Sequence, residues 1–157
     1  MIILDTNIVS EMMLAEPDVR VATWMNNQDS AELYITSITV AEVVFGFSLM
    51  AKGKRRSHLE EKFEAMMSFG FRHRVLPFES KAADQCGKIL AHCQGLGRPI
   101  DGWDAQIAAI AFVHAAQLAT RNIKDFVNCG LILVNPFLEQ PALTVLVDRT
   151  LPKKKRP

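Results

Sequence analysis

Short apolar runs alternate along the chain with longer segments in which apolar residues recur every three or four positions. The runs occupy residues 2–4, 33–35, 75–78, 118–120 and 131–134. Their shortness and the polar residues that bound them are typical of covered strands in a parallel sheet. The intervening segments have helical spacing, as in Leu59, Phe63 and Met66. Strands separated by helices predict an α/β protein with a parallel sheet.

The length of 157 residues fits one domain that is large enough to bury a core. We expect this domain to span residues 1–138 and a C-terminal extension to span residues 139–157. The apolar residues 143–147 of the extension could form an extra strand, bind a partner or derive from a vector. The extension ends in a basic tail, which is Lys153, Lys154, Lys155 and Arg156.

The net charge of +1 is unevenly distributed. The basic tail carries four positive charges, so the rest of the chain has a net charge of about −3. This body is therefore not a basic nucleic-acid binder by bulk charge. Any polyanion must be bound by a local patch or through a metal ion.

Nothing in the chain resembles a membrane span, which needs about 20 apolar residues, and the amino end does not resemble a signal peptide. The three cysteines, Cys86, Cys93 and Cys129, lack metal-binding spacing, and we expect them to be buried apolar residues in a reducing compartment. These features predict a cytoplasmic protein without a membrane partner.

Four acidic residues fall where a strand or loop gives way to a helix. Asp5 and the turn that contains Asp125 follow the first and fourth strands. Glu42 and Asp104, the latter with Asp101 beside it, lie in the first turns of helices that begin at the same sheet edge. Because crossover connections have one handedness, these acids can converge although they are far apart in sequence. That edge is where open α/β sheets bind ligands.

Clustered carboxylates repel one another, and their pKa values would rise unless a cation lay among them. With oxygen ligands and no suitably spaced His or Cys, the expected cation is hard, Mg²⁺ or its substitute Mn²⁺. Such an ion can generate hydroxide and neutralise charge on a phosphodiester. The acidic cluster therefore indicates metal-dependent hydrolysis of phosphodiesters.

Each acid also has a purely structural interpretation. Asp5 could cap the first helix, although its place at the end of a buried strand favours a ligand. Glu42 and Thr39 match a capping box, and Asp125 could cap a turn. Taken singly, these structural interpretations are at least as good for Glu42 and Asp125.

For the pair of aspartates near residue 100, Asp101 suits a helix N-cap better than a ligand. Asp104 then occupies the third helical position, where a carboxylate also suits the helix dipole. The joint placement of all these acids at one edge is what favours metal binding.

Polar residues cluster at the same edge, and their structural role would be to satisfy backbone groups of the turns. Their functional role would be to hold the attacking water or the scissile phosphate. These candidates are Thr6, Asn7, Thr120, Arg121 and Asn122.

Taken together and in order, five stretches of the chain resemble the PIN-domain proteins, and most closely the VapC/FitB-type toxins of bacterial toxin–antitoxin pairs. The resemblance covers about residues 1–137. The stretches are Ile3-Leu4-Asp5-Thr6-Asn7, Ala41-Glu42-Val43, Asp104-Ala105 with Ile107-Ala108-Ala109, Thr120-Arg121-Asn122, and Asp125-Phe126.

This resemblance implies a PIN-like, three-layer α/β/α fold with a central, mainly parallel five-stranded sheet. It implies a Mg²⁺-dependent endoribonuclease whose metal ligands are Asp5, Glu42 and Asp104. The family often has an Asp in a fourth acidic position, where this chain has Asn122, and the nearest carboxylate is Asp125. It also implies RNA as substrate, a cognate antitoxin as partner, and a homodimer.

Two other functions remain compatible with the residues. An aspartate-nucleophile phosphatase would use Asp5, but Asn7 stands where a second Asp is usual. A catalytically weak or inactive binding module would use the acidic pocket to dock a basic antitoxin peptide, and the departure at Asn122 supports that alternative.

Overall fold

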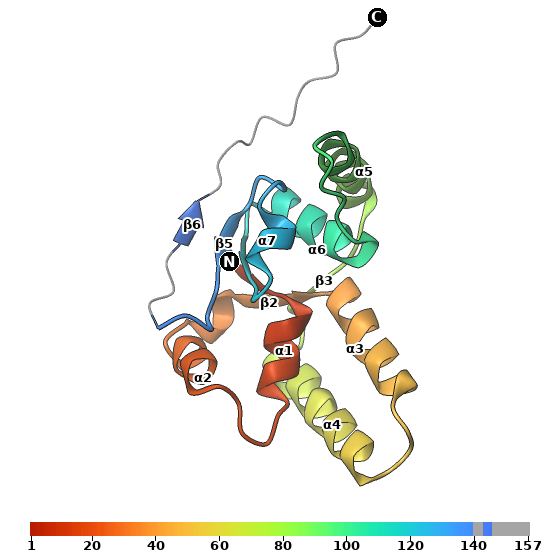
Figure 1. Cartoon of the computed structure of the whole chain (residues 1–157). Helices are drawn as coiled ribbons and strands as arrows, with labels where there is room; N and C mark the ends of the chain where they lie inside the picture. The colour runs from red at the N-terminus through yellow and green to blue at the C-terminus, as the bar shows by residue number, and fades with distance from the viewer. Residues whose placement is uncertain (140–142, 146–157) are drawn as a thin grey trace, which may run out of the picture.

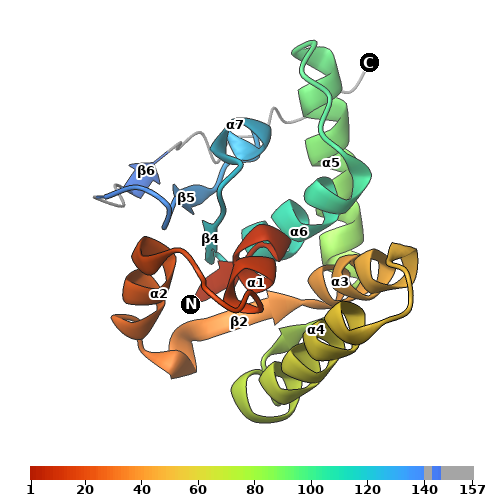
Figure 2. The ribbon, with the colours of Figure 1, turned by 60° about the horizontal axis from the view of Figure 1, so that its bottom comes forward.

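The computed structural model describes residues 1–139 and the backbone of residues 143–145. Its centre is a six-stranded sheet with the strand order β3-β2-β1-β4-β5-β6 (Figure 1). Five strands run parallel, and β6 pairs antiparallel with β5 at the outer edge (Figure 2). The strands are β1 (Ile2–Leu4), β2 (Leu33–Thr36), β3 (Val75–Leu76), β4 (Gln117–Ala119), β5 (Ile132–Val134) and β6 (Leu143–Val145).

The chain reverses its direction of travel across the sheet next to β1. From β1 it proceeds through β2 to β3 on one side, and then returns to β4, which pairs with β1 on the other side. In open α/β sheets, such a reversal leaves a crevice beyond the carboxyl ends of the two strands. The carboxyl ends of β1 and β4 are therefore the expected position of a site.

Across the residues that the structure describes, seven α-helices connect the strands. In Figure 1, α1, α2 and α4 lie on one side of the sheet and α5 and α6 on the other. Short 3₁₀ and π segments lie at residues 30–32 and 66–70. The helices are α1 (Thr6–Met12), α2 (Val19–Asn26), α3 (Ser37–Leu49), α4 (Lys54–Ala65), α5 (Ser80–Gly95), α6 (Gly102–Val113) and α7 (Ile123–Phe126).

Neighbouring residues of each central strand contribute to different cores. Ile3, Leu118 and Leu133 belong to the core under α5 and α6, while Leu4 and Val134, together with Ala119, belong to the core under α1–α4. This alternation is the two-residue period of a strand covered on both faces. The predicted three-layer α/β/α fold with five parallel strands is thereby confirmed.

The segment α6 packs closely because its buried face consists largely of alanines. Ala105, Ala108, Ala109 and Ala111 are fully buried, and the helix lies between the sheet and α5 (Figure 1). Small side chains let the helix backbone approach its neighbours, which fixes the position of the residues at its amino end.

The interpretation of Thr39 and Glu42 as a capping box is wrong. The residue that caps α3 is Thr36 and not Thr39, because β2 passes directly into the helix and the Thr36 side chain accepts a hydrogen bond from the Thr39 amide at 2.9 Å. Glu42 is therefore not part of a capping box.

The C-terminal extension is described only in part. Residues 143–145 form β6, which agrees with one of the three alternatives for this stretch. The basic tail lies outside the described residues. The boundary between the domain and the extension stays a prediction. Across residues 1–139 and 143–145, every helix is too short or too polar to traverse a bilayer.

Candidate active site

An open groove of about 430 Å³ lies beyond the carboxyl ends of β1 and β4. Its walls come from α1, α3, α6 and the loop after β4, and α3 lies beside both α1 and α6 (Figure 2). The sequence predicted seven of the residues that line it. The full lining is Asp5, Thr6, Asn7, Ser10, Glu11, Leu14, Glu42, Asp104, Arg121 and Asn122.

Asp5 is the most firmly held acid of the groove. Its side chain caps α1 by accepting a hydrogen bond from the Thr6 amide at 2.8 Å. Its other oxygen accepts hydrogen bonds from the Asn7 amide group at 2.5 Å and the Thr120 hydroxyl at 2.6 Å. Asp5 is only 3% exposed, so burial raises its pKa, and these three hydrogen bonds oppose that increase. Asp5 is thus both the N-cap of α1 and an acid of the groove, so the two interpretations of this residue are compatible.

Glu42 reaches the groove from the second turn of α3. Its carboxylate accepts a hydrogen bond from the Thr6 hydroxyl, which links α3 to the start of α1. Partial burial raises the Glu42 pKa, and the charges of Asp5 and Asp101 raise it further. Glu42 therefore shares one electrostatic environment with Asp5.

Asp104 lies at the third position of α6, as predicted. Asp101 caps that helix, with its side chain accepting a hydrogen bond from the Trp103 amide at 2.8 Å. Burial raises the pKa of Asp104 to about 7, with further contributions from Asp5, Glu42 and other acids. The carboxylates that the sequence predicted to converge do lie close enough to repel one another.

Asn122 and Asp125 are the two candidates for the fourth acidic position, and the structure places them differently. Asn122 lines the groove, and its amide donates to the Thr120 hydroxyl at 2.9 Å. Asp125 lies in α7 and does not line the groove, but its charge raises the pKa values of Asp5 and Asp104. Asp125 is therefore near the site without facing it.

The predicted polar neighbours form a network around Asp5. The side-chain amide of Asn7 donates to the Thr120 hydroxyl at 3.1 Å as well as to Asp5. The side-chain oxygen of Asn7 accepts a hydrogen bond from the Arg121 backbone amide at 3.0 Å. Thr120 is fully buried. This network joins the start of α1 to the end of β4, so it fixes the two sides of the crevice relative to each other.

Sequence reasoning missed the part of the groove that extends along α1. Ser10, Glu11 and Leu14 line it together with Asn7. The spacing of these residues, at i, i+3, i+4 and i+7, is that of one helix face. This spacing is the signal in the sequence that could have identified the α1 side of the groove.

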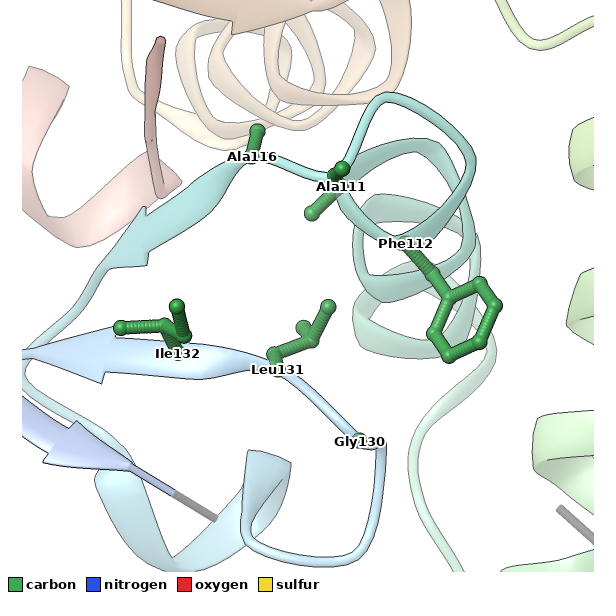
Figure 3. Close-up of a pocket in the computed structure, with 7 residues that line it drawn as sticks. Ala111, Phe112, Ala116, Gly130, Leu131 and Ile132 are labelled. Carbon is green, nitrogen blue, oxygen red and sulfur yellow. The ribbon is translucent and has the colours of Figure 1, made fainter. Parts of the chain in front are cut away.

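A second hollow, of about 60 Å³, lies at the opposite edge of the sheet, where β5 begins and α6 has ended (Figure 3). Its lining includes Phe112, Leu131 and Ile132 and has no titratable side chain. Figure 3 shows these apolar side chains around the hollow. Of these two hollows, only the acidic groove is lined by titratable side chains that could take part in a reaction.

The groove fits a hard divalent cation that retains part of its water shell. Burial raises the pKa values of Asp5, Glu42 and Asp104, and neighbouring acids raise them further, so a cation among these groups would favour their ionised forms. In the described part of the chain, no three Asp, Glu, His or Cys side chains are spaced to enclose one ion by themselves. Mg²⁺ is commonly held by one or two carboxylates together with several waters, which agrees with this spacing.

The sequence is similar to that of a known protein family. Residues 2–128 match the model of the PIN domain. The chain is 39% identical to the VapC ribonuclease Y4jK of Sinorhizobium fredii, over 87% of this chain and 98% of that protein. It is 34% identical to the toxin FitB of Neisseria gonorrhoeae, over 87% of this chain and 99% of that protein.

A solved structure agrees with these similarities. The crystal structure of FitAcB from Neisseria gonorrhoeae superposes on this chain with a TM-score of 0.80 at 34% identity. The superposition covers 87% of this chain and 99% of that one. The superposition thus covers most of this chain and nearly the whole of the other. The match to the PIN domain, over residues 2–128, includes every residue that lines the groove.

Proposed function

The chain belongs to the PIN domain family, and from this premise we propose that it is a Mg²⁺-dependent endoribonuclease and the toxin of a toxin–antitoxin pair. The observation that carries the proposal is the convergence of Asp5, Glu42 and Asp104 on one groove. The charge of Asp5 raises the pKa of Glu42, and the charges of both raise the pKa of Asp104. The relatives named as a ribonuclease and as a toxin support it.

Asp5, Glu42 and Asp104 would hold the metal ion, in part through the waters that it retains. When bound, Mg²⁺, or Mn²⁺ in its place, would supply an activated water and neutralise charge on the phosphodiester. The hydrogen bonds from Thr6, Asn7 and Thr120 keep the Asp5 oxygens oriented before any ion arrives. Such preorganisation avoids a reorganisation cost during the reaction.

Asp104 has a second consequence for binding. Because its pKa is about 7, its carboxyl group holds a proton in a large fraction of molecules at neutral pH. A cation must displace that proton, so binding of the ion and release of the proton are coupled. Asp125 would act from outside the groove by adding negative charge, while Asn122 would contact the substrate or its water.

We further propose that the protein acts in the cytoplasm, as a homodimer, with a cognate antitoxin protein as its inhibitor. The name of the FitB relative as a toxin supports an antitoxin partner. The acidic groove suits a basic side chain from such a partner, because one added positive charge would relieve the repulsion among the acids.

A catalytically inactive module that only docks a basic peptide is the second candidate. Asn122 in the fourth acidic position favours it, since one carboxylate fewer faces the groove. Such a module would bind a basic peptide but would leave RNA intact in the presence of Mg²⁺.

The test is digestion of total RNA by the purified protein with Mg²⁺ or with EDTA, followed by sequencing of the cut ends. We expect internal cuts that require the metal, and loss of cutting in Asp104→Asn. The matched control is Asp101→Asn, which removes a neighbouring negative charge but retains a residue that caps helices well. RNA that stays intact with Mg²⁺, or an active Asp104→Asn variant, would contradict the proposal.

A further inference from the structure

Among the described residues that line the groove, Arg121 is the only basic one. Its backbone is fixed on both sides, because its amide donates to Asn7 at 3.0 Å and its carbonyl accepts from the Asn135 side chain at 3.4 Å. Its side chain is 54% exposed. Arg121 therefore presents an exposed positive charge from a fixed backbone position at the wall of the groove.

The aromatic ring of Phe137 supports the guanidinium group. The central carbon of the Arg121 guanidinium lies 3.7 Å from the centre of the ring, and Phe137 is buried with 7% exposure. An arginine stacked in this way is attracted by the electron-rich face of the ring and keeps its N–H groups pointing outward in the plane. The stack orients the guanidinium without using its hydrogen bonds.

The N–H groups of that guanidinium are free to bind a ligand. Its nearest acidic neighbour is Glu11, at 3.6 Å from Nη2, which is an ion pair longer than a hydrogen bond. Glu11 is itself held by the Asp18 amide, which donates to it at 2.8 Å. Within residues 1–139 and the backbone of residues 143–145, the guanidinium donates no hydrogen bond to protein.

The acid that lies beside the Arg121 guanidinium is Glu11 of α1, and not one of the three acids of the site. Asp18, at the start of α2, has a pKa lowered mainly by Arg20 and slightly by Arg121. The guanidinium thus lies toward the end of the groove lined by Glu11, which is about 6 Å farther along the α1 axis than Asn7.

We propose that Phe137 holds Arg121 over the α1 side of the groove, where the guanidinium binds an RNA backbone phosphate adjacent to the one at the acids. This inference rests on the proposed ribonuclease function. The guanidinium offers planar, paired N–H donors that match phosphate oxygens. Arg121 is then a substrate-binding residue, and Phe137 is a positioning residue that acts through it.

The experiment measures RNA binding in an Asp104→Asn background, so that cleavage does not interfere. A fluorescein-labelled single-stranded RNA of about 12 nucleotides is titrated by anisotropy with millimolar Mg²⁺ over a range of salt concentrations. We expect Arg121→Gln to weaken binding about tenfold. The slope of log affinity against log salt should fall by about 0.7, which is the value for one lost contact to a single-stranded phosphate.

The matched control is Arg20→Gln. Like Arg121, Arg20 is a partly exposed arginine that forms an ion pair with an acid, in its case Asp18. Unlike Arg121, it does not line the groove. We expect its loss to leave the affinity and the salt slope close to those of the parent. Equal changes in the two variants, or an unchanged Arg121→Gln variant, would overturn the phosphate contact.

Phe137→Leu tests the positioning role in a double-mutant cycle. With Arg121 present, we expect about threefold weaker binding from loss of the stack, and with Gln at position 121 no further loss. An equal loss in both backgrounds would overturn the positioning role. Thermal melting of every variant checks that it folds as the parent does.

The outcome also separates this inference from the proposed function. If the parent cuts RNA but Arg121→Gln binds as the background does, only the inference fails. If the parent neither cuts nor binds RNA, the proposed function fails and the inference fails with it.

Discussion

At the scale of single residues, Asp5 combines two roles that the sequence presents as alternatives. Its carboxylate caps α1 and also faces the groove, with its oxygens held by Thr6, Asn7 and Thr120. Asp104 differs, because it is only partly buried and no hydrogen bond from the described residues offsets its repulsion by the other acids. Replacement of the two aspartates should therefore affect stability differently, because only Asp5 is held by hydrogen bonds from its described neighbours.

We predict that Asp5→Ala lowers the free energy of unfolding by about 2 kcal/mol, because α1 loses its cap and the donors of Asn7 and Thr120 lose their acceptor. Asp104→Ala should change it far less or raise it. Urea denaturation in EDTA at pH 8 measures both. Equal destabilisation by the two variants would show that Asp5 has no special structural role.

The raised pKa of Asp104 predicts how the metal-free protein responds to pH. Its folded pKa, about 7, exceeds the ordinary value of 3.8, so the folded state binds the proton more tightly than the unfolded state does. The contribution to stability is therefore complete below pH 3.8 and is lost as the pH rises through about 7.

Thermal melting in EDTA from pH 5 to pH 8 tests this sign. We expect the melting temperature of the parent to fall, relative to that of Asp104→Asn, as the pH rises. Parallel curves for the two proteins would mean that Asp104 is not the group whose pKa is raised.

At the scale of elements, the direct passage of β2 into α3 places Glu42. Thr36 ends the strand and caps the helix, and its hydroxyl also lies 2.9 Å from that of Thr39, with both side chains fully buried. The position of Glu42 in the groove therefore depends on a buried pair of threonines one and two turns before it.

We predict that Thr36→Val costs about 2 kcal/mol, because the Thr39 amide and hydroxyl lose their partner in a buried place. RNA cleavage should fall as well, since Glu42 lies on the same helix. Thr23→Val on the exposed part of α2 is the control, and we expect it to change neither stability nor activity. Equal denaturation midpoints for the two variants would contradict the role of Thr36.

The sequence predicts the elements better than their ends. Five strands and the helices between them follow from apolar runs and helical spacing, and the three-layer fold is confirmed. The capping box at Thr39 was wrong because residues 36–39 offer several hydroxyl groups, and only the pairing of β2 decides which one caps. Such a choice depends on tertiary contacts that local sequence does not contain.

At the scale of the whole molecule, the site exists because the chain reverses its direction across the sheet beside β1. The reversal brings the end of β1 next to that of β4, and with them Asp5 next to Thr120. The alternation of Ile3 and Leu4 between two cores fixes the register that makes this possible. Function therefore depends on topology as much as on the acids.

The convergence of the acids could be predicted from the sequence, because the handedness of crossovers places them at one edge. The position of Arg121 on Phe137 could not, since the two residues meet only through the paths of β4 and β5. The groove along α1 likewise depends on which side of that helix the sheet leaves open.

Calorimetric titration of Mg²⁺ tests the central claim that distant carboxylates share one hard cation. At a pH just below the Asp104 pKa of about 7, in two buffers of different ionisation enthalpy, we expect the parent to bind Mg²⁺ and release protons. Asp104→Asn should bind at least about tenfold more weakly and release none, while Asp101→Asn behaves as the parent. An Asp104→Asn variant that binds Mg²⁺ with the affinity and proton release of the parent would contradict the account.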